Sequence, residues 1–260
     1  MMESNLPVME CKGLGIDFGG LTAVDDFNII VTQNEITGLI GPNGAGKTTV
    51  FNLLTKVYKP SRGEIFLNGI NTKDMNTVKV NKAGIARTFQ NIRLFKEMTV
   101  LENVLVGLHN AMDYRLAGAI LRLPGYWSQE RVAKDKALDL LSIFNMQDEI
   151  DKKAGSLPYG AQRRLEIVRA LATNPVILLL DEPAAGMNPS ETGELMENIR
   201  KIRDMFQIAI LLIEHDMHLV MNICEDISVL NYGRLIAKGA PETIQNDPKV
   251  IEAYLGKGRG

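Results

Sequence analysis

Apolar and polar residues alternate in short runs along residues 8–31, a pattern typical of strands in an antiparallel sheet. Two later runs, residues 176–180 and 208–213, are apolar without interruption and short. Such runs are typical of strands buried on both faces of a parallel sheet. A further strand that ends in Asn68-Gly69 predicts a hairpin. The pattern therefore predicts an α/β fold with β-structure on both sides of its first buried strand.

Between about residues 99 and 169 the apolar spacing becomes helical. The pair Pro124-Gly125 interrupts this spacing and predicts a loop between helices within residues 115–129. We therefore expect one domain, with a core at about residues 1–98 and 170–260 and an inserted helical lobe between them. One lobe helix is predicted from the i, i+3, i+4, i+7 spacing of Leu101, Val104, Leu105 and Leu108.

Composition narrows the class of protein. The formal net charge of the 260 residues is −2, which argues against a basic surface that binds nucleic acid. Only two cysteines are present, so a disulfide scaffold is not expected and a reducing compartment fits. The first residues lack the pattern of a signal peptide, and no apolar run approaches the ~20 residues of a membrane helix. Any role at a membrane is therefore expected to require a partner.

Residues 41–49 read GPNGAGKTT and directly follow an apolar run, which makes them a phosphate-binding loop at the end of a predicted strand. The glycines let backbone N–H groups point inward, and Lys47 adds a charge for the β- and γ-phosphates. Thr48 offers a hydroxyl to Mg²⁺, and a helix predicted at 48–58 directs its positive end at the phosphates. The loop consists of Gly41, Pro42, Asn43, Gly44, Ala45, Gly46, Lys47, Thr48 and Thr49.

Two carboxylates follow the apolar run 176–180, at the strand end where ligands bind in open α/β sheets. Asp181 suits a metal ligand, and Glu182 suits a general base that polarises water. The alternative is a solvated acidic turn. His215 ends the run 208–213 in the same way. It either donates to the γ-phosphate or starts a helix without a ligand.

Three further polar features are less specific. A zinc site built from His215, His218 and Cys224 would lack the fuller ligand set of known zinc sites. Gln90 ends a predicted strand, where an amide can hold a metal ion or water. Residues 157–169 form a turn and a basic helix, in which Gly160 could approach an anion at the helix N-terminus. The alternative for that stretch is a capped helix with surface arginines.

Taken in order, these stretches resemble the ATP-binding subunit of ABC transporters over essentially the whole chain. The residues that carry the resemblance are GPNGAGKTT, Gln90, LPYGAQRRLEI, VILLLDEP, AAGMN and His215. The resemblance implies a RecA-like P-loop NTPase core with an antiparallel β subdomain and an inserted α-helical lobe. ATP and Mg²⁺ are the ligands that it implies.

The resemblance also implies a role for each matching residue. Glu182, His215 and Gln90 would serve catalysis, as the catalytic glutamate, the switch histidine and the Q-loop glutamine. Thr48, Gln90 and Asp181 would hold the metal ion. Beyond the phosphate loop, the nucleotide would be bound by an aromatic ring at Phe18, by the D-loop at Asn188, and by the signature residues Leu157, Tyr159, Gly160 and Gln162.

The resemblance implies an assembly as well. Two ATP-binding subunits, alike or different, would close head to tail, with each ATP between the phosphate loop of one and the signature motif of the other. Closing and opening would drive two membrane-spanning permease subunits, which an extracytoplasmic solute-binding protein supplies. The chain would then lie as a peripheral subunit at the cytoplasmic face of the inner or cell membrane.

Two departures from the family pattern stand out. Pro158 replaces the usual signature serine and so lacks both a hydroxyl and a backbone N–H, and Asn188 replaces the D-loop aspartate. Stretches such as QNIRLFKEMTVLENVLVGLH, DEPAAGMNP and NDPKVIEAYLG look like branched-chain amino-acid importers. The counterpart there is the longer of two ATPase subunits, with extra lobe sequence at residues 121–129. An importer of urea or short-chain amides is the alternative.

Rival functions fit less well. A GTPase should contain an N-K-x-D motif, and a small-molecule kinase needs no signature helix. Soluble ABC ATPases that act on DNA or ribosomes usually carry two cassettes or a coiled coil. Intact Lys47, Asp181 and Glu182 argue against a module that only binds nucleotide. Leu94, Phe95 and Met98 are candidates for a groove that receives a permease helix, or else for lobe core.

Overall fold

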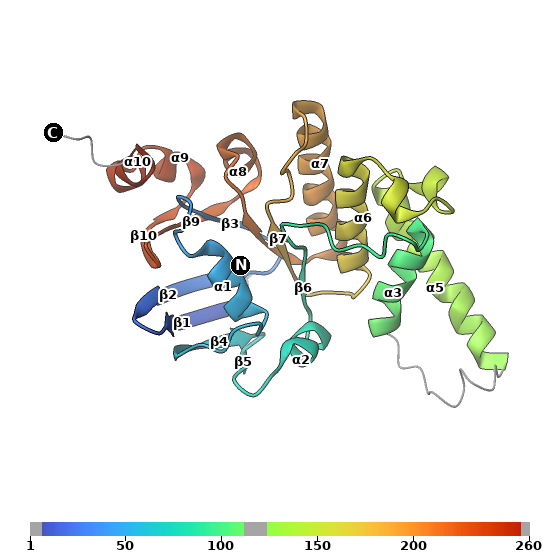
Figure 1. The fold of residues 1–260 in the computed structure, drawn as a ribbon, viewed down its shortest axis with the longest axis horizontal. Coiled ribbons are helices and arrows are strands. Elements are labelled where there is room, and N and C mark those ends of the chain that lie inside the picture. Colours follow the sequence, from blue (N-terminus) through green and yellow to red (C-terminus); the bar gives the residue numbers. More distant parts are fainter. Residues whose placement is uncertain (1–6, 112–123, 256–260) are drawn as a thin grey trace, which may run out of the picture.

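The computed structural model describes residues 7–111 and 124–255, and a six-stranded sheet lies at its centre (Figure 1). Five of its strands are parallel, and β10 pairs with β9 in the antiparallel sense at one edge. Every residue of β3, β7 and β8 is buried, which confirms that the uninterrupted apolar runs are doubly buried strands. The strand order is β10 (Arg234–Gly239), β9 (Asp226–Asn231), β3 (Ile36–Ile40), β8 (Ala209–Ile213), β7 (Ile177–Asp181) and β6 (Ile85–Arg87).

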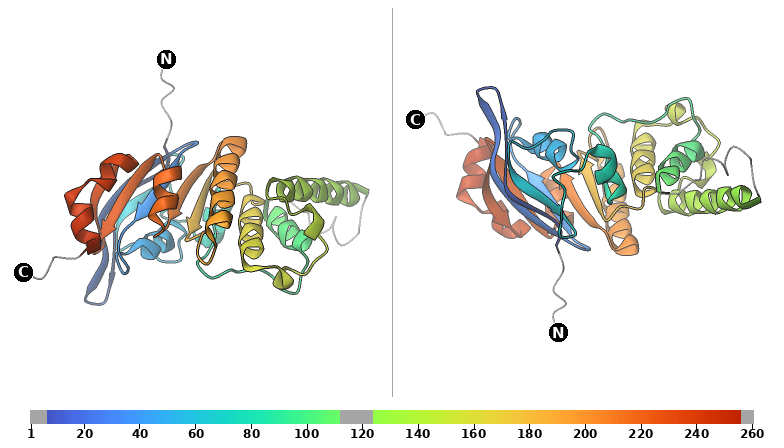
Figure 2. Two further views of the ribbon diagram at one scale, coloured as in Figure 1. Left: turned by 90° about the horizontal axis from the view of Figure 1, so that it is seen from above. Right: turned by 90° about the horizontal axis from the view of Figure 1, so that it is seen from below.

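A second, four-stranded antiparallel sheet packs against this centre (Figures 1 and 2). It confirms the antiparallel strands predicted near the N-terminus. Asn68 and Gly69 have φ values of 48° and 76° and join two of its strands, as expected for a type I′ hairpin. The strand order is β2 (Leu21–Thr32), β1 (Pro7–Phe18), β4 (Arg62–Leu67) and β5 (Ile70–Asn71).

The core helices begin where the sequence places start signals. The helix α1 (Lys47–Leu54) follows the phosphate loop directly, but it ends four residues before the predicted end at Tyr58. The helix α7 (Pro189–Phe206) opens with a capping box, in which Asn188 and Glu191 each bind the other's backbone N–H. The remaining helices of this part are α2 (Thr77–Lys82), α8 (Met217–Ile223), α9 (Pro241–Gln245) and α10 (Pro248–Leu255).

Three helices lie to one side of the central sheet, beyond β6 and α7: α3 (Val100–Ala111), α5 (Pro124–Ile143) and α6 (Tyr159–Leu171) (Figures 1 and 2). Short 3₁₀ turns at Gln147–Glu149 and Ala154–Ser156 connect α5 to α6. Of the interval 115–129, which is predicted to include a loop between helices, the structure describes residues 124–129. They form the first turns of α5, because proline is well tolerated at the start of a helix. Residues 112–123 lie outside the described part, and they include the first three residues of the extra lobe sequence predicted at 121–129.

Two hydrophobic cores lie on opposite faces of the central sheet. Leu178 and Leu180 of β7 point into the core that also holds the apolar side of α6. Ile177 and Leu179 of the same strand point into the core beneath the antiparallel sheet. This alternation follows from the two-residue period of a strand. The lobe helix α6 therefore shares one packed core with the strand that carries Asp181. Among the described helices, none is long and apolar enough to cross a membrane.

Candidate active site

The carboxyl ends of three neighbouring parallel strands meet at one edge of the sheet. The strand β3 leads into the phosphate loop, β7 into Asp181 and Glu182, and β8 into Glu214 and His215. Because the order is β3-β8-β7, the polar ends of segments far apart in the sequence lie side by side (Figure 1). This is the edge at which open α/β sheets bind ligands.

The phosphate loop depends on its glycines. Gly41, Gly44 and Gly46 have φ values of 150°, 78° and 106°. A Cβ atom on Gly41 would lie 2.0 Å from the backbone oxygen of Leu230, so no side chain fits there. Gly233 donates its backbone N–H to the oxygen of Ala45 at 2.8 Å, which ties the loop to the β9–β10 hairpin. The loop is therefore held in shape by its neighbours in the fold.

Lys47 is the first residue of α1 and is 8% exposed. Its Nζ atom donates to the backbone oxygens of Gly41 and Pro42, at 2.7 and 3.0 Å. Burial lowers the pKa of the Lys47 ammonium group, while the charges of Glu182 and Asp181 act in the opposite sense. A buried cation with backbone N–H groups beside it fits a phosphate group.

Asp181 is buried and paired with an arginine that sequence reasoning missed. Arg87 Nη2 lies 2.7 Å from Asp181 Oδ2, and Arg87 Nη1 donates to the side chain of Asn52 in α1 at 2.8 Å. The Arg87 guanidinium also faces the rings of Phe51 and Phe89, with Cζ 5.4 and 4.9 Å from the ring centroids. Carboxylate and hydroxyl oxygens are the ligands that Mg²⁺ prefers, so Asp181 with the exposed Thr48 fits that ion.

The three predicted catalytic side chains lie together. Gln90 Nε2 donates to Glu182 Oε2 at 2.8 Å, and His215 Nδ1 lies 3.8 Å from Glu182 Oε1. Glu182 has a positive φ of 48°, which is unusual for a residue with a side chain. The Glu182 carboxylate therefore leaves a strained backbone position just past β7, with an amide and an imidazole beside it.

A second missed arginine lies beneath this group. Arg163 of α6 has no exposed side-chain surface and pairs with the buried Glu166 at 2.9 Å. The alternative of surface arginines in this helix is therefore wrong for Arg163. A signal was present in the sequence, because Arg163 lies between Gly160 and Ile167 at spacings that share one helix face. Both of those neighbours are buried.

Glu214 is a third residue that sequence reasoning missed. It is 1% exposed, and its carboxylate accepts N–H groups from Ala184 at 2.8 Å and His215 at 3.1 Å. Burial raises the pKa of the Glu214 carboxyl, although these backbone hydrogen bonds lower it in part. Glu214 thus ties the turn after Glu182 to the turn that carries His215.

The signature residues lie at the start of α6 and pack on the D-loop of the same chain. A Cβ atom on Gly160 would lie 2.8 Å from a Glu191 carboxylate oxygen, and one on Gly186 would lie 3.1 Å from the Tyr159 ring. Gln162 donates its side chain to the Leu157 backbone oxygen at 2.8 Å. Within the described residues, no hydrogen bond or ion pair joins residues 157–162 to the phosphate loop. The predicted signature residues and the phosphate loop are therefore two separate features of the described chain.

Two weaker predictions can be placed in the fold. The Phe18 ring is 45% exposed and meets Tyr58 edge to face at 5.2 Å, so it is available for stacking, but its role as the adenine contact stays a prediction. His215, His218 and Cys224 do not form a metal site, because no group of three such ligands gathers among the described residues. Burial raises the pKa of the Cys224 thiol.

A groove of about 530 Å³ lies between the end of β6, α3 and α6. Leu94 and Phe95 line it, whereas Met98 does not. The Phe95 ring is 48% exposed, and the Arg169 guanidinium lies over it with Cζ 5.5 Å from the centroid. Phe95 therefore belongs to a surface groove and not to the lobe core.

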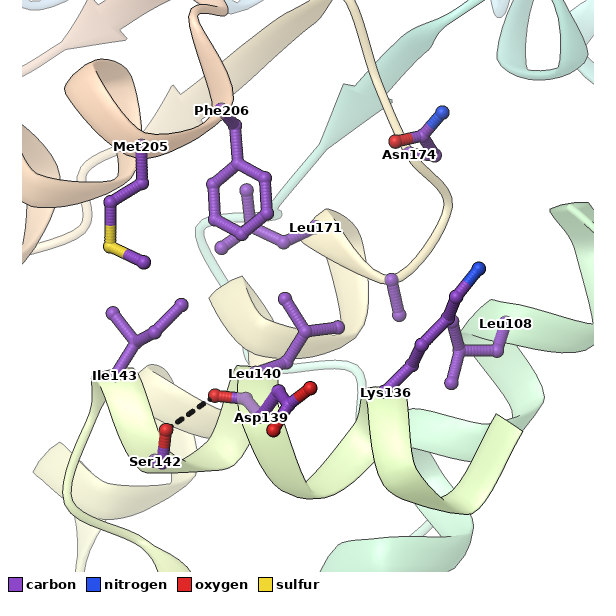
Figure 3. A pocket seen from close by; sticks show the side chains of 11 residues that line it. Leu108, Lys136, Asp139, Leu140, Ser142, Ile143, Leu171, Asn174, Met205 and Phe206 are labelled. Carbon is purple, nitrogen blue, oxygen red and sulfur yellow. Dashed lines mark hydrogen bonds between the residues drawn. The ribbon is translucent and has the colours of Figure 1, made fainter. Parts of the chain in front are cut away.

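A cavity of about 690 Å³ lies between α5 and the end of α7 (Figure 3). Leu140 and Ile143 of α5 line one side, and Met205 and Phe206 at the end of α7 line the other. Lys136 also lines it, from α5. None of the predicted catalytic and nucleotide-binding residues lines this cavity, whereas Pro42, Asn43, Gly44 and Ala45 of the phosphate loop line a separate pocket of about 600 Å³.

Comparisons with known proteins agree with this geometry. A family model described as ABC transporter matches residues 24–185, and one described as branched-chain amino acid ATP-binding cassette transporter matches residues 234–259. The chain is 47% identical to the high-affinity branched-chain amino acid transport ATP-binding protein BraF of Pseudomonas aeruginosa, over 96% of this chain and 98% of that protein. The same figures hold for LivG of Escherichia coli.

Solved structures show the same fold. A nucleotide-free ATP-binding cassette from an ABC transporter matches with a TM-score of 0.83 and 32% identity, covering 96% of this chain and 100% of that chain. The ADP conformation of the cassette MJ1267 matches with a TM-score of 0.83 and 30% identity, covering 96% of this chain and 99% of that chain. Both matches confirm the predicted fold class of core, antiparallel sheet and helical lobe.

Proposed function

The chain belongs to the ATP-binding subunits of ABC transporters, and from that premise we propose that it drives uptake of branched-chain amino acids by binding and hydrolysing ATP. The observation that carries this function is the cluster of Glu182, Gln90 and His215 beside the phosphate loop. Relatives at 47% identity named for branched-chain amino-acid transport support the solute.

Each residue of the cluster has a distinct task in this proposal. Glu182 orients and deprotonates the attacking water, and Gln90 and His215 fix the direction of its carboxylate. Lys47 and the backbone N–H groups of the loop bind the phosphates. Mg²⁺, when bound, neutralises charge on the β- and γ-phosphates, and Thr48, Gln90 and Asp181 are the residues we expect to hold it.

The second half of each ATP site comes from another ATP-binding subunit. Supporting this, no described hydrogen bond or ion pair joins residues 157–162 to the phosphate loop, and Pro158 and Tyr159 are exposed at the N-terminus of α6, although Gly160 and Ala161 behind them are buried. The absence of the signature hydroxyl at Pro158 leaves the Gly160 backbone and the helix N-terminus to contact the γ-phosphate. Asn188 caps α7 with its side-chain oxygen, so its amide group is the part that could reach the partner's nucleotide.

Replacing Glu182 tests the assigned base. We expect Glu182→Gln to lower the rate of ATP hydrolysis at least about 100-fold, because an amide cannot accept the proton from water. ATP binding should persist, since the loop that binds the phosphates is unchanged. The measurements are phosphate release and equilibrium ATP binding. Glu194→Gln, an exposed glutamate in α7, is the matched control. Normal hydrolysis by Glu182→Gln would contradict the assignment.

The solute is tested in the assembled importer. Permease subunits, both ATP-binding subunits and the solute-binding protein are reconstituted in vesicles. We expect leucine-loaded binding protein to stimulate ATP hydrolysis and leucine to accumulate. Stimulation by urea-loaded binding protein in place of leucine would instead identify a urea or short-chain amide importer.

The groove around Leu94 and Phe95 is the proposed contact with a permease subunit, at the cytoplasmic face of the membrane. We expect Phe95→Ala to lower transport several-fold while basal ATP hydrolysis changes little, because an exposed aromatic anchor contributes to docking and not to chemistry. Ile70→Ala, an exposed apolar residue on the antiparallel sheet, is the control. Equal losses of transport and hydrolysis would contradict the docking role.

A further inference from the structure

Arg163 of α6 joins three segments of the active site through backbone oxygens. Its Nη2 donates to the oxygen of Glu182 at 2.8 Å and to that of Gln90 at 3.1 Å. A longer contact of 3.4 Å joins the same nitrogen to the oxygen of Asp181. Its Nη1 donates to the oxygen of Phe89. One buried guanidinium thus binds the end of β7 and the start of the Q-loop at once.

The charge of Arg163 is balanced in place. Nη1 lies 2.9 Å from Glu166 Oε2, one turn later in α6, and both side chains are almost fully buried. Glu166 Oε1 accepts the backbone N–H of Arg93 at 3.1 Å, so the carboxylate also contacts the Q-loop segment. A paired and hydrogen-bonded arginine has a fixed fork of donors, which lysine cannot reproduce.

The hydrogen bond from Arg163 to Glu182 is made to a residue with an unusual backbone conformation. Glu182 has a φ of 48°, which residues with side chains rarely adopt without support from their surroundings. Its N–H donates to Ile213 at 2.9 Å, and its oxygen accepts the N–H of Ala185 at 3.2 Å besides the Arg163 bond. Because the direction of the Glu182 carboxylate depends on this φ, the hydrogen bond from Arg163 helps to aim it.

Gln90 is held from the same point. Arg163 binds the Gln90 backbone oxygen, and the Gln90 side chain donates to the Glu182 carboxylate at 2.8 Å. Arg163 therefore anchors both residues of the Gln90–Glu182 hydrogen bond by their backbones. A shift of α6 would move the two together, while the phosphate loop, which Arg163 does not touch in the described structure, would stay in place.

We propose that Arg163 is a positioning residue for the catalytic carboxylate, through which the signature helix sets the geometry of Glu182 and Gln90 in its own subunit. The inference rests on the proposed function, in which Glu182 is the base. Residues 159–162 begin the same helix one turn earlier, and in the proposed function they contact the other subunit's nucleotide. The occupancy of that nucleotide thus reaches Glu182 through α6 and Arg163.

The variant Arg163→Lys tests this role, because it keeps the positive charge and loses the fork that binds several oxygens. In the full-length chain we expect kcat for ATP hydrolysis to fall about tenfold or more, as for a displacement of about 1 Å in a catalytic group. The KM for ATP and the equilibrium ATP affinity should stay within about twofold, because Lys47 and the loop do not contact Arg163.

Backbone hydrogen exchange gives a readout that does not depend on activity. We expect faster amide exchange in residues 89–93 and 181–187 of Arg163→Lys, and unchanged exchange in residues 41–49. Arg164→Lys is the matched control, since the ion pair of the adjacent Arg164 within the described part of the chain is with Glu194, at 3.7 Å, and not with the Q-loop or the end of β7. It should leave kcat and exchange unchanged.

A second variant keeps the inference testable if Arg163→Lys fails to fold. Arg163→Met combined with Glu166→Met removes both charges, so neither is left buried without its partner. Support requires a lower kcat with retained ATP affinity in a folded variant. An unchanged kcat in Arg163→Lys overturns the inference, as does a parallel loss of kcat, ATP affinity and folding in both variants.

The outcomes separate this inference from the proposed function. If Glu182→Gln is inactive and Arg163→Lys hydrolyses ATP normally, only the role of Arg163 fails. If Glu182→Gln hydrolyses ATP normally, the assigned base itself fails.

Discussion

Two buried arginines hold the candidate site, and they do so in different ways. Arg87 binds a side chain, the Asp181 carboxylate, and bridges it to Asn52 in the helix after the phosphate loop. Arg163 binds mainly backbone oxygens and bridges the signature helix to Glu182 and the Q-loop. Arg87 therefore positions a charged side chain, whereas Arg163 positions the backbone of the Q-loop and of the residues after β7. This difference predicts that they support different steps, metal binding and hydrolysis.

The largest expected effect is the loss of stability when either arginine is removed and its carboxylate partner is left buried without a counter-charge. We expect Arg87→Met to lower the free energy of unfolding by about 3–5 kcal/mol, because it leaves the Asp181 carboxylate buried and unpaired. Adding Asp181→Asn should recover much of that loss. Arg163→Met should cause a similar loss because it leaves the Glu166 carboxylate unpaired, and adding Glu166→Gln should recover much of it. The measurement is urea denaturation of the single and double variants.

Exchanging the partners provides the control for this comparison. Asp181→Asn should not rescue Arg163→Met, and Glu166→Gln should not rescue Arg87→Met. Each carboxylate forms its ion pair with the other arginine: Asp181 with Arg87, and Glu166 with Arg163. Rescue across the pairs would mean that the two arginines form one electrostatic network instead of two separate supports.

A smaller effect distinguishes metal binding from chemistry. Arg87→Lys keeps a charge near Asp181 but loses the fork that also binds Asn52, so Asp181 should be held less firmly relative to Thr48. We expect the Mg²⁺ concentration that gives half-maximal ATP hydrolysis to rise about tenfold, as for a partner of a metal ligand. Arg163→Lys should leave that concentration unchanged while lowering kcat. A matching Mg²⁺ shift in both variants would remove the distinction.

The smallest effect concerns Phe89, which touches both arginines. Its ring lies beneath the guanidinium of Arg87, and its backbone oxygen binds Arg163. The ring also faces Arg93, whose Cζ lies 4.1 Å from the centroid. Phe89→Leu removes the ring and keeps the backbone oxygen that binds Arg163, so it should weaken the cation–π contacts of Arg87 and Arg93 and leave the Arg163 hydrogen bond in place. We expect a loss of about 1 kcal/mol in unfolding free energy, a slightly higher Mg²⁺ requirement and an unchanged kcat. A fall in kcat comparable with that of Arg163→Lys would contradict this separation.

Much of the fold follows from local patterns. The doubly buried strands β7 and β8 and the Asn68-Gly69 hairpin agree with the prediction, because each depends on residues close in the sequence. Pro124-Gly125 predicts an interruption of the helical spacing but not which side of the pair the helix begins on, since proline serves both in a loop and at a first helical position, and α5 begins at Pro124. Local patterns therefore locate the elements better than their ends.

The sequence by itself determined the chemistry of this protein, because the phosphate loop, the carboxylates and the histidine follow apolar runs that form strands of one sheet. Only the tertiary structure decided what holds them. Arg87, Arg163 and Glu214 lie 94, 19 and 30 residues from the groups they bind, as the pairs with Asp181, Glu182 and Ala184 show. A charged residue carries no local sign of its partner, since burial and pairing arise when distant segments pack together.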